Sequence, residues 1–278
     1  MKTKKIKTKE YIYKGTLNEN NMPDGFGKIV FKNGIIYQGK WKDGLYHGYG
    51  VLTLANGDKY DGGFKNGKKH GNGILHYSTG EVYEGEFFED LRDGYGKSTY
   101  PNKAVYEGQY KHDNREGYGE MFWDEETYYK GEFKNDKQNG RGERVSRSNV
   151  YNGQFLNGYA HGKGKMDFGN GEVYEGEFFE EMRTGFATYK YSNGDVYTGN
   201  FIRGVKNGHG VYAYSDGNLY IGSWKDNKRH GEGTFILANG KKQIGIWKED
   251  KFFASKENHQ DNHTSNNGPI KITGSFEK

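Results

Sequence analysis

The chain has 278 residues, of which 45 are glycine, 24 are tyrosine, 17 are phenylalanine and none is cysteine. Disulfides and thiolate metal sites are therefore excluded, and no apolar run approaches the roughly 18 residues of a membrane-spanning helix. The net charge of +4 comes from one end, because residues 1–10 hold five of the 41 basic and one of the 37 acidic residues, which leaves 36 of each elsewhere. A neutral body argues against nucleic-acid binding, which needs basic charge spread over a face.

The first segment, residues 1–10, reads MKTKKIKTKE and forms a basic tip. Its five lysines are Lys2, Lys4, Lys5, Lys7 and Lys9. No apolar stretch follows them, so no secretory signal is expected. Two interpretations stay open for the tip: a solvated terminus, or a contact with anionic lipid at about 1 kcal/mol per charge.

From residue 11 onward the chain repeats itself, and the ten letters GEVYEGEFFE occur at both 80–89 and 171–180. One tyrosine marks each repeat, and successive units are mostly 23 residues apart, as from Tyr60 to Tyr83. The equivalent positions are Tyr13, Tyr37, Tyr60, Tyr83, Tyr106, Tyr129, Tyr151, Tyr174, Tyr197, Tyr220 and Gln243. Glycine follows two residues later in every unit, and an aromatic residue four residues later in every unit except the first, which has Leu17. Such self-similarity is the signature of a repeat architecture.

Within each unit the apolar and polar residues alternate with a period of two. In YEGEF, Tyr83, Gly85 and Phe87 share one face of a strand, and Glu84 and Glu86 share the other. A second glycine pair, such as Gly48 and Gly50 in GYGVLTL, is expected to open another short strand. Asn-Gly and Asp-Gly pairs between units suit two-residue hairpin turns that need positive φ. Each unit therefore predicts two antiparallel strands, and the array predicts an all-β, elongated meander.

The recurring glycine has a physical explanation. An aromatic ring can lie flat over a neighbouring glycine, because glycine has no side chain to push the ring away. Tyr-x-Gly-x-Phe at every second strand thus predicts a ladder of rings over glycines. A single unit is a marginal hairpin, so the stability must come from stacking one unit on the next.

The pattern Tyr-x-Gly-x-Trp/Phe, followed by a Gly-x-Gly pair, resembles the MORN repeat over about residues 11–250. The resemblance implies an elongated single-layer antiparallel sheet. It also implies a scaffold that binds proteins or associates with membranes. Family members include radial spoke head proteins of the ciliary axoneme, so a cytoplasmic location at the cytoskeleton or in a cilium is expected. Residues 251–278 form the remaining tail, in which ITGSF at 272–276 looks like a partial capping strand.

Three places depart from the regular period. The first unit has one extra residue near NENNMPDG, and the sixth lacks one near RVSRSNVY. A bulge or a different turn must absorb the missing residue, so a change in curvature is expected at about 142–151. At the end, Ile244 and Ile246 stand where most units have polar residues. Phe252, Phe253 or residues 270–276 are expected to fold back and cover them.

Candidate catalytic and metal-binding residues are few. His47, His70, His161 and His230 occupy one repeat position, but units about 10 Å apart cannot share a metal ion. These histidines are interpreted as turn residues. The Glu84/Glu86 pair lies on a flat face that offers no pocket to raise a carboxyl pKa. No catalytic residue, cofactor or metal site is therefore expected.

A candidate partner-binding patch lies five residues after each repeat tyrosine. This position is lysine in six units but Leu156, Phe179 and Ile202 in three consecutive ones, with Phe88 as an isolated match. Clustered exposed apolar side chains usually mark an interaction site. The alternative is that these side chains tuck into the aromatic layer.

The sequence thus favours a non-catalytic scaffold that binds protein partners along an extended sheet. The first alternative is a membrane-associated tethering module that binds anionic lipid through the lysine tip. The second alternative is a non-catalytic subunit of an enzyme complex. Partners are expected to be other proteins in a large assembly and not nucleic acid, and homo-oligomerisation stays open.

Overall fold

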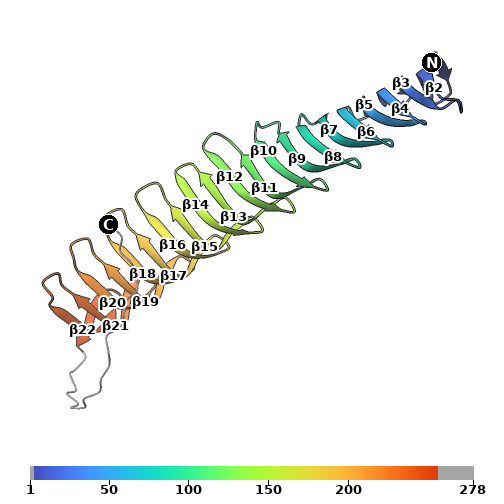
Figure 1. Ribbon diagram of the computed structural model, residues 1–278. Coiled ribbons are helices and arrows are strands. Elements are labelled where there is room, and N and C mark those ends of the chain that lie inside the picture. Colours follow the sequence, from blue (N-terminus) through green and yellow to red (C-terminus); the bar gives the residue numbers. More distant parts are fainter. Residues whose placement is uncertain (1–2, 256–278) are drawn as a thin grey trace.

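The computed structural model describes residues 3–255, and within this range every regular element is a β-strand (Figure 1). The strands form one 23-stranded antiparallel sheet. Each strand pairs with its neighbours in sequence, from β1 (Lys4–Lys7) at one end to β23 (Lys251–Ser255) at the other. The predicted single-layer meander is confirmed, and the sheet extends past residues 11 and 250.

Two kinds of strand alternate along the sheet. The strands that carry the repeat tyrosine position are β2 (Tyr11–Leu17), β4 (Ile36–Lys42), β6 (Lys59–Lys65), β8 (Val82–Phe88), β10 (Val105–Lys111), β12 (Thr127–Lys134), β14 (Asn149–Leu156), β16 (Val173–Phe179), β18 (Val196–Ile202), β20 (Leu219–Lys225) and β22 (Lys242–Lys248). The longer strands between them are β3 (Pro23–Phe31), β5 (Leu45–Thr53), β7 (Lys68–His76), β9 (Leu91–Thr99), β11 (Asn114–Phe122), β13 (Lys137–Ser146), β15 (Tyr159–Asp167), β17 (Met182–Lys190), β19 (Val205–Ala213) and β21 (Lys228–Ile236).

The core of the protein is an aromatic layer on one face of the sheet. All ten repeat tyrosines are almost completely buried. Tyr129, in the middle of the array, is 0% exposed and packs edge-on against Phe133 of its own strand and Phe155 of the next unit, with ring centroids 5.1 and 5.0 Å apart. Its hydroxyl donates a hydrogen bond of 2.8 Å to the Glu132 carbonyl oxygen. Every unit therefore buries its tyrosine only with the help of its neighbour.

A row of glycines crosses the sheet beneath these rings. Gly119, Gly131 and Gly142 are register partners on adjacent strands. A Cβ at Gly131 would lie 2.6 Å from the Arg141 carbonyl oxygen, from the Gly142 Cα and from the Tyr129 hydroxyl. This spacing confirms the predicted packing of tyrosine rings over glycine, and it shows that neighbouring backbones also approach too closely for a side chain.

Each hairpin contains a β-bulge directly beside the glycine row. In the β4–β5 pair, Gly39 faces Gly50 but the next pair is Trp41 with Tyr46, so three residues of β5 face one residue of β4. Gly48 lies in this bulge with a φ of 62°. Bulges bend a strand and increase its twist, in agreement with the curved strands of Figure 1. The sequence predicted that Gly48 opens this strand. The strand β5 instead starts at Leu45, so the second glycine pair lies inside it.

The two-residue turns lie at the opposite end of each hairpin from the predicted place. Asn33 and Gly34 belong to a longer loop, in which the Gly34 N–H bonds to the Phe31 carbonyl oxygen and only Gly34 has a positive φ. The short turns instead follow the tyrosine strands, as at Glu180 and Glu181, whose φ values are 46° and 70°. Positive φ at both residues is the condition for a type I′ turn. The prediction that Asn33-Gly34 and the equivalent pairs between other units form two-residue turns was therefore wrong, whereas Asn66-Gly67 and Asn157-Gly158, which follow tyrosine strands, do form them.

The two irregular units are accommodated in their connections. The loop of the first unit runs over residues 18–22 between β2 and β3. At the sixth-to-seventh junction, Ser146 pairs with Asn149, so a two-residue turn at Arg147 and Ser148 replaces the longer loop of other units. The prediction that a different turn absorbs the missing residue is confirmed, and β14 keeps its tyrosine on the buried face.

The C-terminal end differs from the predicted cap. Phe252 does fold back, but it packs on the aromatic face, 5.4 Å from the ring of Trp247. Phe253 is 74% exposed and Ile244 is 51% exposed, so neither phenylalanine buries this isoleucine. The reason is strand parity, because Phe252 pairs with Trp247 and its ring therefore lies on the opposite face from Ile244. The alternative cover, residues 270–276, lies outside the described residues.

Candidate functional site

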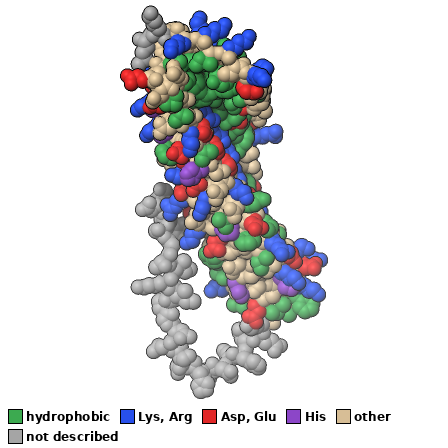
Figure 2. Space-filling model, turned by 90° about the vertical axis from the view of Figure 1, so that its right-hand side faces the viewer, with side chains coloured by type: hydrophobic (Ala, Val, Ile, Leu, Met, Phe, Trp, Pro, Cys, Tyr) green, Lys and Arg blue, Asp and Glu red, His purple; other side chains and the backbone are tan. Residues whose placement is uncertain are grey.

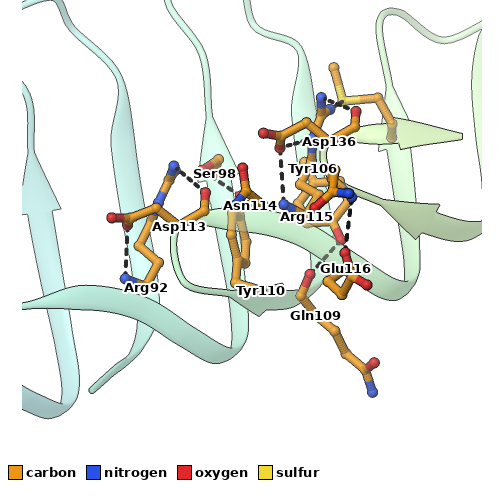
Figure 3. Close-up of polar contacts among 12 residues, drawn as sticks. Arg92, Ser98, Tyr106, Gln109, Tyr110, Asp113, Asn114, Arg115, Glu116 and Asp136 are labelled. Atoms are coloured by element: carbon orange, nitrogen blue, oxygen red, sulfur yellow. Dashed lines mark hydrogen bonds and ion pairs between the residues drawn. The ribbon is translucent and has the colours of Figure 1, made fainter. Parts of the chain in front are cut away.

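Cations cover the aromatic face over several of the repeat units. Arg92 places its guanidinium carbon 4.8 Å from the centre of the Tyr110 ring, and its Nε lies 3.2 Å from an Asp113 carboxylate oxygen. Arg115 and Asp136 repeat the arrangement one unit later (Figure 3). Each aspartate sits in a two-residue turn, so the contact connects successive units. These cations stabilise the repeat packing and cover the aromatic rings of their own units.

Lys206 also places its charged group over aromatic rings, as Arg92 and Arg115 do. The turn residue of the next unit is Asn227, whose Oδ1 accepts only the backbone N–H of Lys206. The ammonium group lies 4.5 Å from the Trp224 ring centre and 4.6 Å from that of Tyr212. Burial lowers the pKa of Lys206 to about 8. Aromatic faces attract such a desolvated cation, and we interpret Lys206 as part of the packing.

The predicted partner-binding residues lie on the other side of the sheet, at the ends of strands. Phe88, Leu156, Phe179 and Ile202 are the last residues of β8, β14, β16 and β18. Their side chains are 53%, 44%, 52% and 53% exposed. They do not tuck into the aromatic layer, although the Phe179 ring lies 5.3 Å from that of His161. Whether a partner binds them stays a prediction.

Sequence reasoning missed the residues that face them across the two-residue turns. Leu156 pairs with Tyr159, Phe179 with Met182 and Ile202 with Val205. We call these six side chains the turn ridge. The equivalent pairs are Lys65 with Lys68, Lys134 with Lys137 and Lys225 with Lys228 in other units. The signal was present in the sequence, but it becomes visible only when the turn is known to contain two residues.

The turn ridge is thus three consecutive apolar pairs on a surface where lysine pairs are common. Successive units lie about two strand spacings apart, so the ridge extends over roughly 20 Å. Tyr159 and Met182 are also exposed. A contiguous exposed apolar patch of this kind usually marks an interaction site.

The polar face also has depressions along its middle. One of about 610 Å³ is lined by Asp61, Glu84, Glu86 and Glu107, together with Lys97. Another of about 750 Å³ lies further along the sheet and includes Phe186, Val211, Ile221 and Ile244. The face is therefore charged over one region and mainly apolar over another.

The Glu84/Glu86 pair lies in β8, and the four repeated histidines lie in the longer strands. Glu86 accepts a hydrogen bond of 2.9 Å from the backbone N–H of Tyr95. Within residues 3–255 no three His, Asp or Glu side chains are grouped closely enough to hold a metal ion. His47 and His70 lie within β5 and β7, so the interpretation of these histidines as turn residues was wrong. Their position beside the bulge still separates them by a whole unit.

The lysine tip is partly built into the sheet. Lys4, Lys5 and Lys7 belong to β1 and are exposed, Lys9 is exposed in the following turn, and Lys2 lies outside the described residues. Lys5 pairs with Lys14, and Lys14 pairs with Lys28, so three lysines stand side by side on adjacent strands. Figure 2 shows basic side chains around a group of hydrophobic ones at this end of the molecule. The part of the chain that the structure describes contains no helix with the length and apolarity needed to span a membrane.

Hairpins stacked into an open single-layer sheet, with a tyrosine over a glycine pair in each, define a repeat protein. The MORN repeat model matches residues 13–36, 37–59, 60–82, 83–105, 106–125, 129–149, 151–173, 174–196, 197–219 and 220–242. The chain belongs to the MORN-repeat family. No curated protein matches it.

Solved structures with some similarity include two domains in complex with peptides. One is the wild-type TCP10 domain of Danio rerio CPAP with a peptide of Danio rerio STIL, at 18% identity and a TM-score of 0.42, covering 85% of this chain and 99% of that chain. The other is the SAS-4 (dCPAP) TCP domain with a proline-rich motif of Ana2 (dSTIL) of Drosophila melanogaster, at 16% identity and a TM-score of 0.27, covering 72% and 90%. Similarity this low says nothing about the partners of this chain.

Proposed function

We propose that this chain is a non-catalytic scaffold that binds protein partners through the turn ridge, as part of a cilium or another cytoskeletal assembly. The observation that carries the proposal is the replacement of lysine pairs by three consecutive apolar pairs. Six side chains at the turns of β14–β15, β16–β17 and β18–β19 are involved, and they are not needed to close the aromatic core.

The extended shape supports a scaffold role. Twenty-three strands at about 4.8 Å per spacing give a sheet on the order of 100 Å long. A sheet of this length presents several separated surfaces to partners at once. The cytoskeletal part of the proposal rests on the family resemblance of the sequence.

The ridge is tested by changing Leu156, Phe179 and Ile202 together to serine. We expect the variant to lose its partners in affinity purification with mass spectrometry, because the apolar anchors are gone. The thermal midpoint should change little, since all three side chains are about half exposed. We expect cytoskeletal proteins among the partners that co-purify with the wild-type chain and do not co-purify with the variant.

A matched control changes Lys42, Lys65 and Lys225, which occupy the same repeat position, to serine. This control should keep the partners. An unchanged partner set in the ridge variant would contradict the proposal. So would a large drop in its thermal midpoint, which would show that the ridge belongs to the core. Recovery of an enzyme whose other subunits carry the activity would favour the alternative of a non-catalytic subunit.

The lysine row at the N-terminal end favours a second candidate function, tethering to an anionic membrane. Each basic side chain near such a surface contributes about 1 kcal/mol. We expect Lys5, Lys14 and Lys28 to increase co-sedimentation with phosphatidylserine vesicles relative to phosphatidylcholine vesicles. Changing all three to glutamine should reduce the difference, because Lys4, Lys7 and Lys9 remain exposed at the same end. Equal sedimentation with both kinds of vesicle would exclude this function.

A further inference from the structure

The polar face changes its chemistry near β17. One register row runs across the sheet beside the glycine row, on the opposite face. From β6 to β13 every residue of this row except Ile74 is charged. Its members there are Asp61, Ile74, Glu84, Lys97, Glu107, Glu120, Lys130 and Glu143. Over the last strands it consists of uncharged β-branched residues, namely Thr188, Thr198, Val211, Ile221, Thr234 and Ile244. We call this second part the β-branched row.

All members of the β-branched row except Thr188 line the depression of about 750 Å³. Val211, Ile221 and Ile244 remain 38%, 45% and 51% exposed there, beside Phe186 at 63%. The charged residues at equivalent positions show that the fold does not require apolar side chains on this face. Exposed apolar groups in a depression indicate that something covers them.

A second copy of the chain is a poor fit to this surface. The row spans five strand spacings, about 24 Å, and the apolar strip is about 13 Å wide, which gives on the order of 300 Å². A stable complex usually buries about 800 Å² on each partner. A short segment of the same chain needs no such area, because its attachment gives it a high effective concentration.

Residues 270–276 have the pattern that such a segment requires. Ile270, Ile272 and Phe276 alternate with Lys271, Thr273 and Ser275, so an extended segment would present one apolar side. From Ser255, which pairs with Gly245 in β22, residues 256–269 could reach about 46 Å when extended. The β-branched row lies within that reach.

We infer that residues 270–276 dock on the β-branched row and cover Val211, Ile221 and Ile244. The tail then acts as an internal cover of a second interaction surface, distinct from the turn ridge. A partner with a similar alternating apolar segment has to displace the tail in order to bind. Only molecules in which the tail is released can bind such a partner. The apparent dissociation constant is therefore the intrinsic one divided by the fraction of molecules with a released tail.

Engineered cysteines test this docking. The sequence contains no native cysteine that could react with a cross-linker. We would introduce Ile221→Cys together with Ile272→Cys and treat the dilute full-length protein with a short bismaleimide. The matched control combines Asp216→Cys with Ile272→Cys, since Asp216 is exposed in the loop before β20 and lies within the same reach of the tail as Ile221. We expect cross-linking within one molecule to be several-fold greater for the first pair. No partner protein takes part, so the outcome is independent of the proposed function.

A second measurement uses the single Ile221→Cys change in the full chain. Adding Ile272→Asp and Phe276→Asp should increase the rate at which a maleimide labels residue 221. Equal cross-linking of the two pairs, or an unchanged labelling rate, would overturn the inference. Stronger cross-linking of Ile272→Cys to Phe253→Cys would instead place the segment at the free edge of β23, and cross-linked dimers would indicate a second copy.

Discussion

Replacing Tyr129 by alanine is expected to lower the free energy of unfolding by about 3–5 kcal/mol, the usual cost of removing a large buried aromatic side chain. The ring is completely buried and contacts both Phe133 and Phe155. Its removal therefore disrupts the packing between two units as well as within one. Urea unfolding followed by far-UV circular dichroism measures the loss.

The control is Tyr129→Phe, which keeps the ring and removes the hydroxyl that donates to the Glu132 carbonyl oxygen over 2.8 Å. This change should cost only about 1 kcal/mol, as for a typical hydrogen bond. If alanine and phenylalanine cost the same, the ring packing does not hold the units together. The stability of the repeat would then rest on the backbone ladder.

The strands that lose protection in the Tyr129→Ala variant are as informative as the size of the loss of stability. Each strand pairs only with its neighbours in sequence, and repeat proteins of this kind lose stability at the weakened interface. In the Tyr129→Ala variant, hydrogen exchange is expected to be fastest in β11–β14. Strands near either end should keep the protection that they have in the unchanged protein.

The faces of the sheet follow from the sequence because a single physical requirement recurs in every unit. A tyrosine ring needs bare backbone beneath it, so Tyr-x-Gly-x-Phe fixes which side is buried. The bend of each hairpin does not follow in the same way. Gly48 is the first residue of a Gly-x-Gly pair in the sequence, and only the register of β4 and β5 shows that it occupies a bulge.

The turns show how a strong local signal can mislead. Asn-Gly is typical of type I′ turns and forms such turns at Asn66-Gly67 and Asn157-Gly158, but Asn33-Gly34 and its equivalents in other units lie in longer loops. Other type I′ turns contain pairs such as Glu180 and Glu181, which adopt positive φ at a cost of about 1 kcal/mol or more each. The strand register set by the aromatic layer outweighs this local preference. Consequently the first residue of each turn-ridge pair could be predicted, but the partner across a turn such as Glu180-Glu181 could not, because that pair carries no turn signal.

Gly131→Val is expected to cost about 3 kcal/mol, near the upper end for overpacking a buried site. The new Cβ would lie 2.6 Å from the Tyr129 hydroxyl, and also from the Gly142 Cα and the Arg141 carbonyl oxygen of the adjacent strand. Valine is a good strand residue, so the cost has to come from these contacts. Lys134→Val on the same strand is the control, since Lys134 is exposed at its end.

Combining Gly131→Val with Tyr129→Ala separates the two sources of the cost. Removing the ring relieves one clash but leaves the clash with the backbone of β13 in place. We therefore expect the combined variant to lose less stability than the sum of the single variants, but more than Tyr129→Ala alone. Additive losses would show that the ring and the glycine act independently, and that neighbouring backbones alone require glycine at residue 131.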